Sequence, residues 1–117
     1  VVLRIDLDVS AMEAAPGGEV VGTGGGRVFV FSPSEMKVTH TADNPLGDFS
    51  HICLAPDGNL YGINGGHVGR ITSEGWRVDE VASPGGKFLV PAPSGSLYFG
   101  RGSHVLRVRL TVAPESK

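Results

Sequence analysis

The chain has 117 residues, with 10 Lys and Arg against 12 Asp and Glu, and its formal net charge of −2 excludes a basic field that would attract a nucleic-acid backbone. Eighteen glycines and eight prolines beside 40% hydrophobic residues are too apolar for disorder and too interrupted for long helices. The longest apolar runs are about five residues, against the roughly 20 of a membrane span. We therefore expect one soluble domain with no nucleic-acid or membrane partner. Cys53 is the only cysteine, and the compartment stays open, secretion included.

The first predicted element is an outer strand over residues 1–8. Every second residue there is apolar, which is the period of a half-buried strand: Val1, Leu3, Ile5 and Leu7.

Three copies of one pattern follow this strand. APGGEVVG at 15–22 returns as APDGNLYG at 55–62 and as APSGSLYF at 92–99. Their prolines lie 40 and then 37 residues apart, which is the spacing of four-stranded propeller blades. Each copy has a pair that favours positive φ directly after its proline, so we expect a two-residue hairpin there.

The predicted strands are short and separated by glycine-rich or polar turns. They cover 11–15, 19–23, 27–31 and 36–41, then 51–55, 59–63, 67–71 and 76–81, and finally 88–92, 96–99 and 104–110. No segment has a helical period. The predicted fold class is all-β, a single partial β-propeller domain over 1–117. Its blades span 9–41 and 46–81, its incomplete blade spans 86–110, and 111–117 form a tail.

Three blades cannot close a ring, because propellers have about 4 to 8. Two explanations stay open. A homodimer would close a six-bladed ring in which residues 1–8 of each chain finish the last blade of the other. Alternatively, the chain is a portion of a longer propeller that supplies the missing blades. Opposite charges would meet at the dimer junction, since Asp6 and Asp8 would face Arg107 and Arg109.

The blade phrase PDGNLYG at 56–62, followed by Gly65-Gly66 and VGRI at 68–71, resembles three groups of propellers. These are NHL-type scaffolds, gluconolactonase-like hydrolases and virginiamycin B lyase-like proteins. The shared residues make turns and cores, so the resemblance implies a fold rather than an activity. It also implies carbohydrate or protein as partner. Gluconolactonase-like enzymes hold a divalent metal at the central channel, and no motif here carries those ligands over.

The innermost strand of a blade lines the channel, so polar residues on it are the first site candidates. Glu13 and His51 lie on such strands, where they could act as metal ligand and general base of a metal-assisted reaction. The alternative is that both only fill or hydrogen-bond within the blade interface. Cys53, between two apolar residues, is expected to be inert packing.

A second set of candidates lies on one rim. Arg27, His67 and His104 each begin the third strand of a copy, so repetition would set them around a ring that could hold anions or sugar hydroxyls. Tyr61 and Tyr98, also equivalent, could add stacking faces. The alternative is that these are solvated turn and strand residues.

The leading hypothesis is a non-catalytic propeller module that binds carbohydrate or protein on one rim and needs no cofactor. One alternative is a metal-assisted lyase or lactonase of the virginiamycin B lyase or gluconolactonase type, with a divalent metal at Glu13 and His51. Another is a scaffold fragment of a larger propeller enzyme.

Overall fold

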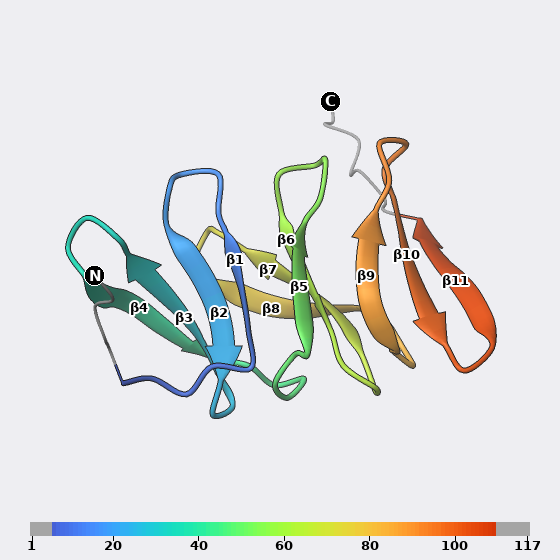
Figure 1. Ribbon diagram of the computed structural model, residues 1–117, viewed down its shortest axis with the longest axis horizontal. Helices are drawn as coiled ribbons and strands as arrows, with labels where there is room; N and C mark the ends of the chain where they lie inside the picture. Colours follow the sequence, from blue (N-terminus) through green and yellow to red (C-terminus); the bar gives the residue numbers. More distant parts are fainter. Residues whose placement is uncertain (1–5, 110–117) are drawn as a thin grey trace, which may run out of the picture.

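Residues 6–109 are described by a computed structural model, in which all strands belong to three antiparallel sheets. The sheets stand side by side, each with its strands in simple sequence order (Figure 1). This arrangement confirms the predicted all-β class and the blade pattern. Over residues 6–109 there is no helix with the length and hydropathy of a membrane span.

The strand bounds agree with the predicted ones to within two residues. The first sheet holds β1 (Ala11–Ala14), β2 (Val20–Gly24), β3 (Arg27–Ser32) and β4 (Lys37–Asp43); the second holds β5 (His51–Leu54), β6 (Leu60–Ile63), β7 (Val68–Thr72) and β8 (Arg77–Ala82); the third holds β9 (Lys87–Pro91), β10 (Ser96–Arg101) and β11 (His104–Arg109). Strands β1, β5 and β9 are the innermost, and β5 lies between the other two (Figure 1).

The predicted outer strand over 1–8 lies mostly outside the described residues. Its last part, residues 6–8, belongs to no strand of the described chain. This stretch leads into β1 past Gly24, where an added Cβ would overlap the Asp8 carbonyl group. A glycine at position 24 lets the entering chain lie directly against the β2–β3 hairpin.

The loops after the three prolines differ from the predicted two-residue hairpins. In the first sheet, Gly18 N–H donates to Ala15 O at 3.1 Å, and Ala15 N–H donates to Glu19 O at 2.8 Å. These bonds enclose three residues: a type I turn with Pro16 at its second position, followed by Gly18 at φ 92°. The other two sheets repeat the geometry. The proline favours the type I turn, and the glycine supplies the left-handed residue that such a turn needs.

Two apolar clusters lie between the sheets and hold them together. The first joins sheets one and two and contains Ala15, Val21, Val28, Val30, Phe49, Ile52, Leu60, Ile71 and Val78. The second joins sheets two and three and contains Cys53, Ala55, Tyr61, Ile63, Val68, Leu89, Leu97 and Phe99. A sheet of this size buries too little surface alone, so each depends on its neighbour.

In the first two sheets, the space beside the glycines of the central strands is filled by a phenylalanine that comes from a different segment in each. In the second sheet Phe49, from the loop before β5, lies over Gly62 and Gly69, where an added Cβ would overlap its ring. In the first sheet Phe29 of β3 covers Gly22 in the same manner. The repeat therefore conserves the filled volume while it exchanges the residue that fills it.

Replacing Gly62 by Ala should lower the free energy of unfolding by about 1–3 kcal/mol, because the new methyl group overpacks the Phe49 ring. Gly65→Ala is the matched control, since nothing lies within 4 Å of its Cβ position, and its effect should stay within about 0.5 kcal/mol. Urea unfolding measures both. Equal effects of the two substitutions would contradict the packing described for Phe49.

Candidate functional site

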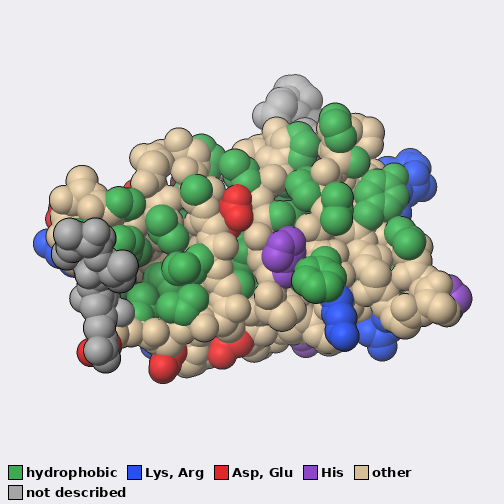
Figure 2. Space-filling view, viewed as in Figure 1, with side chains coloured by type: hydrophobic (Ala, Val, Ile, Leu, Met, Phe, Trp, Pro, Cys, Tyr) green, Lys and Arg blue, Asp and Glu red, His purple; other side chains and the backbone are tan. Residues whose placement is uncertain are grey.

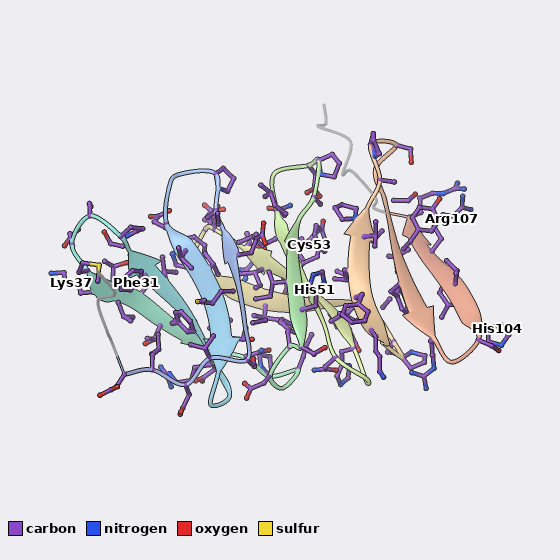
Figure 3. All side chains as sticks on the ribbon, in the orientation of Figure 1. Phe31, Lys37, His51, Cys53, His104 and Arg107 are labelled. Atoms are coloured by element: carbon purple, nitrogen blue, oxygen red, sulfur yellow. The ribbon has the colours of Figure 1, made fainter. Side chains whose placement is uncertain are left out.

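His51 links the second sheet to the third at the innermost strands. Its ring is half-buried on β5, and its Nδ1 accepts a hydrogen bond of 3.0 Å from the backbone N–H of Leu89 on β9. The edge of the ring also meets Phe88, with 6.0 Å between the ring centroids and 73° between the planes. Figure 3 shows His51 beside Cys53 on β5, between the first and third sheets.

The bond from Leu89 decides which nitrogen of neutral His51 carries the proton. An N–H donor faces Nδ1, so Nδ1 must offer a lone pair, and the proton lies on Nε2. Nε2 makes no hydrogen bond to another residue in 6–109. In this tautomer His51 presents a donor rather than a base.

Phe88, next to this ring, is the most exposed aromatic side chain of the described residues, at 67%. Its backbone has φ 54°, a conformation that bulky residues seldom adopt and that is found at functional sites. The pairing of β9 with β10 shifts register at this point, so the irregular backbone is part of the sheet. Lys87, also exposed, precedes it.

Glu13 has different neighbours from His51. It is half-buried on β1, and its negative charge acts on the Cys53 thiol. Burial first, and then the charges of Glu13 and Asp57, raise the pKa of Cys53 to about 11. Cys53 therefore stays a thiol at neutral pH. Within residues 6–109 no group of three or more His, Cys, Asp or Glu side chains is placed to hold a metal ion.

Two of the predicted rim residues, Arg27 and His67, bind within their own sheets rather than to each other. Arg27 reaches the outermost strand β4, where it contacts Asp43 at 3.2 Å and donates to Thr41 at 3.1 Å. His67 makes the same kind of contact in the second sheet, through Nδ1 to Glu80 of β8. His104 is exposed at the start of β11, which is the last strand of the third sheet within residues 6–109 (Figure 3).

The two predicted stacking tyrosines differ in exposure. Tyr61 is 1% exposed, and its hydroxyl donates to Asp57 at 2.6 Å. Burial, together with this bond and the Asp57 charge, raises the pKa of Tyr61 to about 12. A ring buried between sheets offers no stacking face, and this expectation is corrected. Tyr98 is half-buried on the outer side of the third sheet, with Ser94 where the second copy has Asp57.

Sequence reasoning did not select Phe88. Its alignment with His51 in the repeat was visible, and that equivalence places both on innermost strands. What distinguishes Phe88 is its high exposure beside the register shift between β9 and β10, which no local sequence pattern predicts.

Comparison with known proteins identifies the architecture as part of a β-propeller. No protein-family model matches the chain, and no curated protein sequence is significantly similar to it. Among solved structures, virginiamycin B lyase from Staphylococcus aureus is similar with a TM-score of 0.64 and 18% identity over 88% of this chain. A streptogramin B lyase is similar with a TM-score of 0.62 and 16% identity over 90% of it. The chain spans 41% of the length of each, and at this identity the likeness establishes the fold.

The raised pKa of Cys53 predicts a loss of stability in base. The unfolded thiol loses its proton near its ordinary value of 9.0 and the folded one near about 11, so unfolding becomes easier as pH rises between them. Urea midpoints at several pH values across this window measure the slope. Cys53→Ala should make it shallower, and an unchanged slope would show that another group is responsible.

The tautomer of His51 can be observed directly. In ¹⁵N spectra of the neutral imidazole, Nε2 should carry the proton and Nδ1 should show the shift of an unprotonated nitrogen accepting a hydrogen bond. A proton on Nδ1 would contradict the bond from Leu89.

Proposed function

We propose that this chain is a non-catalytic propeller module that binds a carbohydrate at the channel side of its second and third sheets. The observation that carries the proposal is the exposed ring of Phe88, held edge to face with His51 on neighbouring innermost strands. An apolar ring suits the hydrophobic face of a sugar, and hydrogen-bonding groups beside it suit the hydroxyls.

Two polar groups beside Phe88 support this choice of ligand. The Nε2–H of His51 is a donor whose orientation is held by the bond to Leu89. The exposed Lys87 ammonium, on β9 next to Phe88, is a second donor. A rigid ring with oriented donors loses little conformational entropy when a ligand binds. The rim residues Arg27 and His67 are less suited, because carboxylates already occupy them.

The lyase alternative rests on the fold shared with virginiamycin B lyase and streptogramin B lyase. Its general base would be His51, and the Nε2 that faces away from Leu89 carries a proton in the neutral ring. The geometry therefore favours binding over proton abstraction at this residue. In the scaffold alternative, further blades supply the activity. They would pack on this chain through contacts like those between its own sheets.

NMR titration of labelled protein with glucose-, galactose- and N-acetylglucosamine-based oligosaccharides tests the proposal. One of these sugars should shift resonances of His51 and Phe88. Phe88→Ala should weaken that sugar's binding about tenfold, because the stacking face is lost. Glu74→Ala is the control, since Glu74 is exposed in the turn before β8, and it should leave binding unchanged.

Two results would contradict the proposal. The first is the absence of shifts at His51 and Phe88 with every sugar up to about 10 mM, a concentration that detects even weak sites. The second is turnover of a streptogramin B antibiotic by the chain with loss of that turnover in His51→Asn, which keeps an acceptor for Leu89 but removes the imidazole.

A further inference from the structure

The outer face of the third sheet, the side turned away from the second sheet, is apolar and uncovered. Val90 of β9 is 58% exposed and Val105 of β11 is 78% exposed, with the half-buried Tyr98 of β10 between them. A hollow of about 990 Å³ opens here, lined by these residues together with Phe88 and Gly100. Hydrophobic side chains gather over this end of the molecule (Figure 2).

The same positions of the second sheet are buried. Val90, Tyr98 and Val105 follow Cys53, Tyr61 and Val68 by 37 residues, and those three are only 7%, 1% and 0% exposed. What covers them is the third sheet, through Leu89, Leu97 and Phe99. The outer face of the third sheet is thus equivalent to the face of the second sheet that the third sheet covers.

The other half of that contact is uncovered at the opposite end of the chain. Met12 of β1 corresponds to Ile52 of β5 and Leu89 of β9, which are each 2% exposed because they pack against the preceding sheet. Met12 itself is 55% exposed. Met36, at 38%, corresponds to Trp76, which packs against the first cluster. The first sheet therefore exposes the surface that, in the second and third sheets, packs on the outer face of the preceding sheet.

We propose that the outer face of the third sheet is covered by the first sheet of a second copy of this chain. The contact repeats the one between the second and third sheets, so Met12 of the second copy would fill the hollow near Val90 and Val105. Each copy has one face of each kind, and two such contacts close a ring of six blades. Phe88 would keep access to the channel, because the equivalent His51 remains half-buried rather than buried after its face is covered.

Among residues 6–109, the third sheet lacks the outermost strand that the second sheet has. In the second sheet Arg70 of β7 lies opposite Asp79 of β8, with 3.9 Å between their charged groups. Arg107 on β11 corresponds to Arg70, and among residues 6–109 no strand lies beyond β11 (Figure 3). Its side is therefore open to a strand that carries an acid at the position of Asp79.

Mass measurement by light scattering on the whole chain tests the proposal. The expected mass is twice 12.2 kDa at micromolar concentration. Val105→Asp should shift it to the monomer mass, because the carboxylate would be buried in the contact. The substitution leaves the monomer's fold intact, since Val105 is 78% exposed in the single chain. A wild-type monomer, a larger assembly, or a dimeric Val105→Asp variant would overturn the proposal.

Ser94→Asp is the matched control. It adds the same charge to the same sheet. The equivalent position of the second sheet is Asp57, which already accepts a hydrogen bond from Tyr61 beneath a covered face. This variant should remain dimeric with unchanged affinity.

Discussion

The packing of one sheet face on the next is the interaction on which the rest of this structure depends. None of the three sheets encloses a core of its own, and the apolar side chains of the described residues are buried mainly in the two clusters between them. Each fully buried large side chain contributes about 1.5–3 kcal/mol. Stability is therefore nearly a sum over neighbouring pairs of sheets, as in other repeat proteins. The outward faces of the first and third sheets have no neighbouring sheet within residues 6–109 and so take part in no such contact.

The repeat keeps a volume rather than a residue. Phe49 and Phe29 fill equivalent space from a loop and from a strand, and glycines stand where their rings lie. An alignment by residue type alone would count these positions as unrelated. The two positions compensate each other in volume: where one sheet has a phenylalanine on the strand, the other has a glycine there and a phenylalanine from the loop. Both overpacking and an empty cavity would cost stability.

The candidate site uses the same contact between sheets. His51 accepts a hydrogen bond from a backbone group of the next sheet, so the bond that joins the two blades also fixes the orientation of the imidazole. Phe88 stands against it from the neighbouring strand. A binding side chain at the contact between two sheets is held rigidly by the packing that already stabilises the fold. It needs no additional hydrogen-bond network to hold it in place.

The sequence by itself determined the class, the number of blades and nearly every strand, because glycine and proline turns and short apolar runs are local features with local causes. It also placed Glu13, His51, Arg27 and His104 on the correct strands, whereas His67 lies just before β7. Only the tertiary structure decided which side chains meet. Tyr61 and Tyr98 are equivalent in the repeat, yet one is buried and the other faces the open end. Arg27 and His67 pair with carboxylates on their own outermost strands, and the neighbours of His51 lie on another sheet. Burial and pairing depend on residues far apart in the chain, which repeat spacing cannot locate.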